Sequence, residues 1–282
     1  MKRLLNITAI IFATIVAFAG CDKIEEGDYL IFAGSSGSWY EGQPVADHTK
    51  RVFVEKYTGV RCVNCPSADV AISALQNTYG HDVVAVSIHA GALARPWNGF
   101  ADLRTTDGDE WNNYFGIEAY PSIMINRSKT GNAWNIITAV GGIAAGVENA
   151  IGLPADIAMN ITTEYDAASR SVTIFPNIEF VESITAPLTI TLLVMEDGIV
   201  GKQTTPEGNN ENYVFNHVLR DVITDLWGAD IDADGNQGTC RMGAFNYTLP
   251  QEYVAENCHI VAFISNKDTR EILQCAEAAI VE

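Results

Sequence analysis

The chain has 282 residues, and its 35 Asp and Glu outnumber its 17 Lys and Arg, giving a formal net charge of −18 at pH 7. A surface this negative repels phosphate backbones, which excludes nucleic acid as a partner. Hydrophobic residues make up 48% of the sequence, enough for a sizeable core. At roughly 100–200 residues per domain, the length predicts two domains, with one large domain as the alternative. Only residues 1–20 form a long apolar run, so a channel or transporter built from membrane-spanning helices is excluded.

The N-terminal segment is typical of an exported lipoprotein. Two basic residues precede an apolar stretch over residues 4–18, and two small residues come directly before Cys21. This arrangement resembles the bacterial lipobox, which implies cleavage before Cys21 and acylation of that residue. We therefore expect residues 1–20 to be a signal peptide, residues 21–47 to be a tether, and acylated Cys21 to hold the protein on the lipid bilayer. The alternative is an ordinary secretory signal with a chance cysteine.

A pair of cysteines follows the first predicted strand. Residues 51–57 are rich in β-branched and aromatic side chains, and Cys62 and Cys65 then open a predicted helix that ends near Gly80. A second predicted strand, over residues 83–89, is almost continuously apolar, as in a strand buried on both faces. In this setting two cysteines separated by two residues indicate thiol–disulfide chemistry and not a zinc site, which needs more ligands.

The expected chemistry gives each cysteine its own role. The thiolate, not the thiol, attacks a disulfide, and Cys62 at the start of a helix lies beside unpaired amides and the positive end of the helix dipole. Arg61 adds a positive charge next to it, so we expect Cys62 to attack and Cys65 to resolve the mixed disulfide. The alternative is a static structural disulfide or an inert pair.

A proline further along the chain supports the same interpretation. Tyr120-Pro121 precedes an apolar strand and resembles the cis-proline segment of thioredoxins, in which the proline lies beside the cysteines and offers backbone to the substrate. The resemblance implies a thioredoxin-like α/β fold over residues 48–153. Thioredoxins have a buried acid at the position that Lys56 occupies here. Because Glu55 is one residue away from it, a redox-tuning role for Glu55 requires a bulge in the strand.

The second half of the chain predicts an all-β domain. Short strand-like runs alternate with turn signals from residue 157 to residue 276, which favours a β-sandwich over residues 154–282. Such folds host binding far more often than chemistry, and no pairing of a nucleophile with a base occurs there. The predicted fold class is therefore an α/β thioredoxin-like domain followed by an all-β sandwich domain.

One acidic motif in this half suggests a metal site. Asp230, Asp232 and Asp234 stand at positions 1, 3 and 5 of a segment that begins like a calcium-binding loop, but position 12 is Arg241 where such loops have Glu. Calcium is therefore the one cofactor that the sequence suggests besides a redox-active disulfide. An acidic turn is the alternative.

Two cysteines near the C-terminus suggest a disulfide. Cys258 and Cys275 flank a predicted hairpin around Lys267 almost symmetrically. Neighbouring strands would bring the two thiols together, and the export signal places the protein in a compartment that permits disulfides. We therefore expect a cross-strand disulfide between them, with Cys240 left free.

The chain as a whole resembles the outer-membrane lipoprotein family named for a twenty-eight-kilodalton outer membrane protein of Gram-negative anaerobes. The resemblance rests on the lipobox, on residues 55–66, on Tyr120-Pro121-Ser122 and on residues 216–220. It implies a lipid-anchored protein of the outer membrane, on either the periplasmic or the surface face.

These features favour a membrane-anchored thiol–disulfide oxidoreductase of the cell envelope. In this interpretation Cys62 attacks, Cys65 resolves, Pro121 shapes the groove, and the partners are thiols or disulfides of envelope proteins. The first alternative is a surface or outer-membrane binding or adhesion lipoprotein whose thioredoxin-like domain is a non-catalytic scaffold. The second is a partner subunit of a larger envelope complex, which the acidic β-domain would suit.

Overall fold

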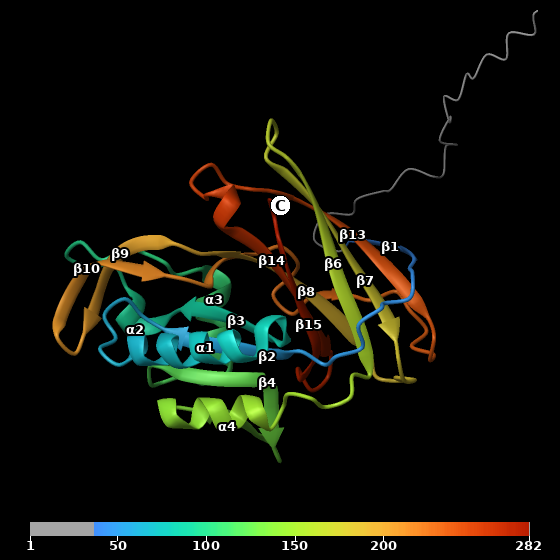
Figure 1. Cartoon of the computed structure of the whole chain (residues 1–282), viewed down its shortest axis with the longest axis horizontal. Coiled ribbons are helices and arrows are strands. Elements are labelled where there is room, and N and C mark those ends of the chain that lie inside the picture. Colours follow the sequence, from blue (N-terminus) through green and yellow to red (C-terminus); the bar gives the residue numbers. More distant parts are fainter. Residues whose placement is uncertain (1–36, 282) are drawn as a thin grey trace, which may run out of the picture. The chain divides into compact units, whose positions relative to one another are not determined.

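Strands are the main secondary structure of the protein. The computed structural model describes residues 37–281, and its strands form three sheets (Figure 1). The largest sheet has nine strands, in the order β15 (Ile272–Ala279), β14 (Cys258–Asn266), β8 (Leu188–Glu196), β11 (Val218–Val222), β3 (Val83–His89), β2 (Val52–Thr58), β4 (Ser122–Thr130) and β5 (Ala133–Ile137), with β12 (Ala229–Asp230) also pairing with β8.

Two smaller sheets accompany the largest one. The four-stranded sheet has the order β1 (Ser38–Glu41), β13 (Cys240–Thr248), β7 (Ser171–Phe180) and β6 (Ile157–Asp166). The remaining two strands, β9 (Ile199–Thr205) and β10 (Gly208–Phe215), form a hairpin of their own, here called the β9–β10 hairpin.

The helices are few and mostly short. The longest, α1 (Cys65–Tyr79), follows β2, as the sequence predicts, and buries Cys65, Ala68, Ile72 and Leu75. The others are α2 (Gly91–Ala94), α3 (Thr106–Tyr114), α4 (Ile143–Glu148) and the 3-10 turns η2 (Gly80–Asp82), η3 (Val140–Gly142) and η4 (Ala255–Asn257). Among the described residues, no helix is both long and apolar enough to cross a membrane.

The predicted fold class, an α/β thioredoxin-like domain followed by a β-sandwich, is wrong, because the described chain is mostly β and its two halves share one sheet. In an α/β domain followed by a separate β-sandwich, no strand of the first domain pairs with a strand of the second. Here β2 to β5, from the first half of the chain, belong to the same sheet as β8, β14 and β15 from the second half. Strand β11 makes the join, because it runs parallel to β3 through Val218 and Ser87 and antiparallel to β8. The Ser87 amide donates to the His217 carbonyl at 2.6 Å, and the Ser87 hydroxyl donates to the Asn216 carbonyl at 3.2 Å. The predicted boundary after residue 153 falls between α4 and β6.

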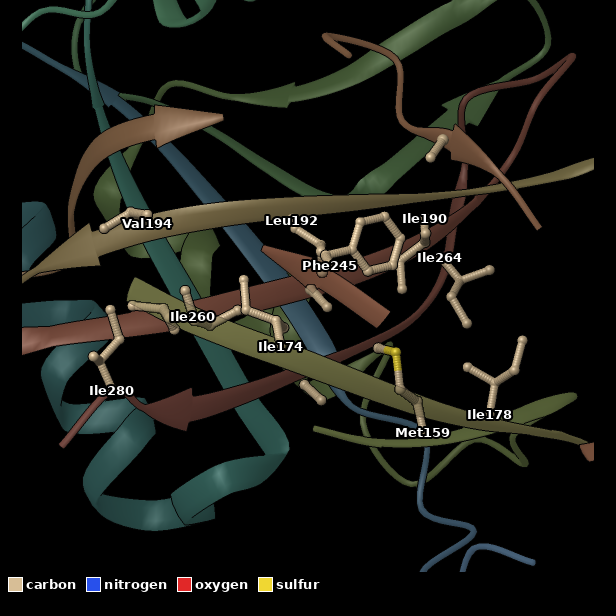
Figure 2. Close-up of a cluster of buried hydrophobic side chains, with 14 of the residues drawn as sticks. Met159, Ile174, Ile178, Ile190, Leu192, Val194, Phe245, Ile260, Ile264 and Ile280 are labelled. Carbon is tan, nitrogen blue, oxygen red and sulfur yellow. The ribbon is translucent and has the colours of Figure 1, made fainter. Parts of the chain in front are cut away.

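The largest core cluster lies between the four-stranded and the nine-stranded sheets. Strand β7 is buried at every second residue, so that one face carries Val172, Ile174, Ile178 and Phe180 into the core, while every residue of β8 is buried because the nine-stranded sheet is covered on both faces. Figure 2 shows how side chains from the two sheets meet, among them Met159, Ile174, Ile178, Ile190, Leu192, Val194, Phe245, Ile260 and Ile264.

Two further clusters cover the part of the sheet around β2. One packs Val52, Val54 and Ile123 against Ile72 of α1 and Ile143 of α4. On the opposite face, the other joins residues from both halves of the chain, including Phe53, Tyr57, Trp111, Phe115, Leu193, Met195 and Phe263. Successive side chains of β2 point to opposite faces of the sheet. On one face they pack against α1 and α4, and on the other they pack against residues that include several from the second half of the chain.

Candidate functional site

The two cysteines of the candidate site form a disulfide at the N-terminal end of α1. The Cys62–Cys65 bond measures 2.07 Å, and the two Cα atoms are 5.4 Å apart. Cys62 is only 2% exposed and Cys65 only 1%. Pro66 occupies the first turn of the helix, where a missing amide hydrogen leaves no bond unmade. The predicted pair is thus brought together, but in an oxidised and buried state.

Pro121 lies close to the end of β2 from which the chain leads to the two cysteines. The Tyr120–Pro121 peptide bond is cis, as predicted, and Pro121 is buried. Strand β4 begins at the next residue and pairs antiparallel with β2, with Ser122 opposite Tyr57. This register places the proline beside the end of β2, from which the chain turns toward Cys62. The Tyr120 hydroxyl donates to the Asn112 side-chain oxygen at 2.7 Å.

The β9–β10 hairpin covers the loop that carries Cys62. The Gln203 side-chain amide donates to the Cys62 carbonyl at 2.9 Å, and the Thr204 backbone amide donates to the Val60 carbonyl at 3.0 Å. Phe215, at the other end of the hairpin, packs against Val60 in a small apolar cluster. Because these residues lie about 140 positions after the cysteines in the sequence, no local signal identifies them as part of the site.

An ion pair between a buried lysine and a partly exposed aspartate lies on the α1 side of β2. Lys56 is 3% exposed, and its ammonium contacts the Asp69 carboxylate on α1. The second oxygen of that carboxylate accepts a hydrogen bond from the Tyr213 hydroxyl at 2.8 Å. Burial lowers the pKa of Lys56 to about 7, so the amine depends on the neighbouring carboxylate to stay charged. Tyr213 thereby connects the hairpin to the helix that Cys65 begins.

His89, at the end of β3, is a buried histidine that forms no ion pair with any described residue. Burial, followed by the charges of Lys56 and Arg220, lowers the pKa of His89 to about 3, so the ring is neutral near pH 7. Its Nδ1 atom has no hydrogen-bond partner within the described part of the chain, and its ring packs edge-on against Phe215 with centroids 5.5 Å apart. His89 therefore contributes an apolar contact under the hairpin.

Glu55 does not face the cysteines. Its carboxylate accepts two hydrogen bonds from the Arg127 guanidinium, at 2.9 and 2.7 Å, and the two side chains are 1% and 2% exposed. A bulge in β4, with Asn126 and Arg127 at φ values of 50° and 47°, directs Arg127 into the core. Since Glu55 and Lys56 point to opposite faces of β2, the geometry gives Glu55 no path to the disulfide, and we correct its predicted tuning role to a structural one.

Arg61 stays beside the disulfide, but its bonds are made to the protein backbone. The guanidinium donates to the Ala92 carbonyl, and the Arg61 amide donates to the Leu93 carbonyl at 3.0 Å. The Nε atom is buried and has no partner among the described residues. Arg61 thus connects the loop of Cys62 to α2 while its charge remains next to the cysteines.

The carboxylates of the predicted calcium site, Asp230, Asp232 and Asp234, do not converge on a common position. Asp230 pairs with Lys267, Asp232 pairs with Arg241 at 3.2 Å, and Asp234 accepts bonds from Asn236 and Thr239. No group of three or more His, Cys, Asp or Glu able to hold a metal ion occurs in the described part of the chain. The arrangement is that of an acidic turn in which each carboxylate has its own partner.

The expected C-terminal disulfide is not formed. Cys258 and Cys275 are both free and buried. The register of β14 and β15 keeps them apart, because it places Cys275 opposite Phe263 while the Cys258 carbonyl accepts a hydrogen bond from the Ile280 amide. Burial raises the pKa of the Cys258 thiol to about 12 and that of Cys275 well above its ordinary value. Cys240 is free as well and half-buried, and Cys21 lies outside the described residues.

Comparison with known proteins identifies the family. The profile of the Omp28 outer membrane protein family matches residues 108–282, which is more than half of the chain. The chain belongs to this family. The predicted resemblance is therefore confirmed, and with it the predicted location at the outer membrane. The matched range contains Pro121 and the β9–β10 hairpin but neither Cys62 nor Cys65, so membership of the Omp28 family says nothing about the chemistry of the disulfide.

Three of the solved structures that match the chain do so at 16–19% identity. HBP35 of Porphyromonas gingivalis superposes with a TM-score of 0.60 at 17% identity, over 84% of this chain and 77% of that one. A protein of Agrobacterium tumefaciens gives 0.48 at 16% identity, over 84% and 97% of the two chains. A domain of the outer membrane lipoprotein Omp28 from Porphyromonas gingivalis gives 0.31 at 19%, over 45% and 88%. No curated protein matches the chain. The likeness to HBP35 describes the fold alone.

Proposed function

We propose that this Omp28-family lipoprotein is a binding protein of the outer membrane and that its Cys62–Cys65 disulfide is structural. One observation carries the proposal: the disulfide is closed, and neither of its cysteines is more than 2% exposed. Thiol–disulfide exchange requires a thiolate to reach a sulfur atom directly. The β9–β10 hairpin lies on the loop that holds these sulfur atoms, so a client thiol has no open approach.

A row of aromatic side chains supports a binding role and provides a surface for it. Tyr114 is 52% exposed, and its ring lies 4.5 Å from that of Trp227 and 6.4 Å from that of Trp134, measured between centroids. Lys129 stacks on Trp134 at 3.9 Å, and Arg270 stacks on Trp227 at 4.7 Å. Tryptophan, tyrosine and arginine are the residues that most often dominate protein–protein binding energy.

The charges of this aromatic row favour an acidic envelope protein as the partner. Lys129 and Arg270 contact aromatic rings, and neither forms an ion pair with another described residue, although acids outnumber bases two to one in the chain. Two cations that stack on rings and lack carboxylate partners remain available to an anionic surface. The net charge of −18 disfavours nucleic acid, as the sequence predicts.

A second candidate function remains thiol–disulfide exchange, and a specific observation favours it. The Cys62–Cys65 pair stands at the start of α1, where the helix dipole stabilises a thiolate, and cis-Pro121 lies by the end of the adjoining strand. This geometry suits exchange if the sulfur atoms become accessible.

The experiment that separates the two functions is an exchange assay on the full-length protein in detergent. Reduction of insulin by dithiothreitol should proceed at the same rate with the protein, with the Cys62→Ser, Cys65→Ser double variant and without protein. A structural disulfide should also have a reduction potential below about −300 mV. Acceleration that disappears in the double variant would establish the oxidoreductase instead.

The binding surface has a matched control within the chain. Trp97 is 67% exposed and lies outside the aromatic row. Cross-linking on intact cells should give a product that contains another outer-membrane protein. This product should be absent in the Trp227→Ala and Arg270→Ala variants and present in the Trp97→Ala variant. A product that survives both row variants would show that binding uses another surface.

A further inference from the structure

The β9–β10 hairpin is attached to the protein differently from every other described strand. Its strands pair with each other, with Val214 opposite Val200, and with no strand of the two larger sheets. Figure 1 shows it beside α2, at the end of the nine-stranded sheet that carries the start of α1. Of its strand residues only Gln203 and Phe215 are buried. A segment with so few buried contacts belongs to the part of a protein that opens locally at low free energy.

Hydrogen bonds from Gln203, Thr204 and Tyr213, together with packing near its base, hold the hairpin in place. Gln203 donates to the Cys62 carbonyl, the Thr204 amide to the Val60 carbonyl, and Tyr213 to Asp69. Near the base of the hairpin, Phe215 packs with Val60 and Leu103 in an apolar cluster that Ile199 and Tyr213 also join, and Lys202 stacks on Phe100 at 5.0 Å. The hydrogen bonds of Gln203, Thr204 and Tyr213 end on the cysteine loop or on the helix that follows it, so these contacts dock the hairpin over the disulfide.

The base of the hairpin has the features of a hinge. Gly198 and His217, which flank the two strands, have φ values of 72° and 58°. Across the base, the Asn216 side chain accepts a bond from the Gly198 amide at 2.9 Å, and Asp197 accepts one from the His217 amide. These bonds fix the two ends of the hairpin to each other, so that the strands between them are able to move as one unit about a few residues.

We propose that the β9–β10 hairpin is a hinged cap, and that the Cys62–Cys65 disulfide reacts with thiols only while this cap is lifted. The inference goes beyond the proposed function, because it concerns when the disulfide is accessible and holds for a structural or an exchanging disulfide alike. Lifting the cap removes the Gln203 and Tyr213 bonds and exposes the cysteine loop, while the three core clusters stay packed.

The reaction with dithiothreitol makes the proposal testable. One thiolate of the reagent attacks the Cys62 sulfur, the bond to Cys65 breaks, and Cys65 leaves as a thiolate that takes a proton from water. The second thiolate of the reagent then attacks the mixed disulfide, so that Cys62 leaves and the reagent departs as its cyclic disulfide. Two electrons pass to the protein, and both new thiols are trapped by alkylation and counted by mass spectrometry.

The first experiment uses the unmodified full-length protein. We compare the rate of disulfide reduction in the folded protein with the rate in denaturant. The ratio of the second rate to the first should equal the hydrogen-exchange protection factor of the Thr204 amide, because the docked hairpin protects that amide through its bond to Val60. It should be far smaller than the protection of the amides in central strand β8. Absence of slowing, or slowing as large as the protection of β8, would overturn the cap, because the disulfide would then be open already or exposed only by global unfolding.

The second experiment loosens the cap. Gln203→Ala and Tyr213→Phe each remove one attachment and should raise the reduction rate of the folded protein about tenfold. Val200→Thr, at a hairpin position that is 63% exposed, is the control and should leave the rate unchanged. Faster Thr204 exchange without faster reduction would contradict the proposal. Since neither experiment measures insulin turnover, failure of the cap and failure of the proposed function are distinguishable.

Discussion

The buried Glu55–Arg127 ion pair offers the sharpest test of how the two halves of the chain are held together. Glu55→Gln keeps the size and shape of the side chain but removes the negative charge. The Arg127 guanidinium would then remain 2% exposed with no anion beside it, between the rings of Trp111, Phe115 and Phe263 at 4.8, 5.0 and 4.8 Å from its carbon atom. An uncompensated buried charge of this kind costs about 3–5 kcal/mol.

The three aromatic rings reduce this loss without cancelling it. A desolvated cation over an aromatic face gains about 2 kcal/mol, but these contacts exist in the unmodified protein too and so do not replace the carboxylate. We expect Glu55→Gln to lower the free energy of unfolding by about 3 kcal/mol, a large share of the about 5–15 kcal/mol typical of folded domains. Arg127→Met, which leaves the Glu55 carboxylate buried alone, should lower it by a similar amount.

Urea unfolding of the two single variants and the double variant measures the coupling. Glu55→Gln combined with Arg127→Met leaves no buried charge, so the double variant should be more stable than either single one. A loss below about 1 kcal/mol for Glu55→Gln would refute the reasoning, because it would show that water reaches the pair as it reaches surface ion pairs. Additive losses in the double variant would refute the coupling itself.

Three further predictions concern acid, calcium and the lipid anchor. Because the pKa of His89 falls from 6.5 to about 3 on folding, the unfolded chain binds the extra proton between these values, and lowering the pH from 7 to 4 should cost about 3 kcal/mol of stability through this residue. His89→Gln should lose that part of the slope in urea titrations at a series of pH values, and an unchanged slope would show that the ring is solvated. Calcium at millimolar concentration should leave the melting temperature unchanged, since Asp230, Asp232 and Asp234 have separate partners, whereas a rise would mean that the turn rearranges around the ion. Cys21→Ser should abolish labelling with radioactive fatty acid and release the protein from the outer-membrane fraction, and retention with unchanged mobility would disprove the anchor.

The parts of the site that the sequence determines are local ones. The order of β2, the cysteine pair, α1 and β3 is predictable because each element depends on neighbours a few residues away, through apolar spacing, Pro66 and the stop at Gly80. The cis bond before Pro121 belongs to the same class, since it is carried by a short segment of sequence. The outer-membrane location follows from the N-terminal pattern and the family resemblance.

The tertiary structure alone decides what surrounds these local elements. The sequence specifies the strand that Ser87 belongs to but not its partner, and the pairing of β3 with β11 turns two expected domains into one continuous sheet. The register of β14 and β15 separates Cys258 from Cys275 although their spacing in the sequence suggests a bridge. The bulge at Asn126 turns Arg127 toward Glu55, so that the two side chains form an ion pair. The docking of the distant β9–β10 hairpin buries Cys62. Strand pairing, register and docking depend on contacts between residues far apart in the chain, and local propensity carries no information about which of those contacts form.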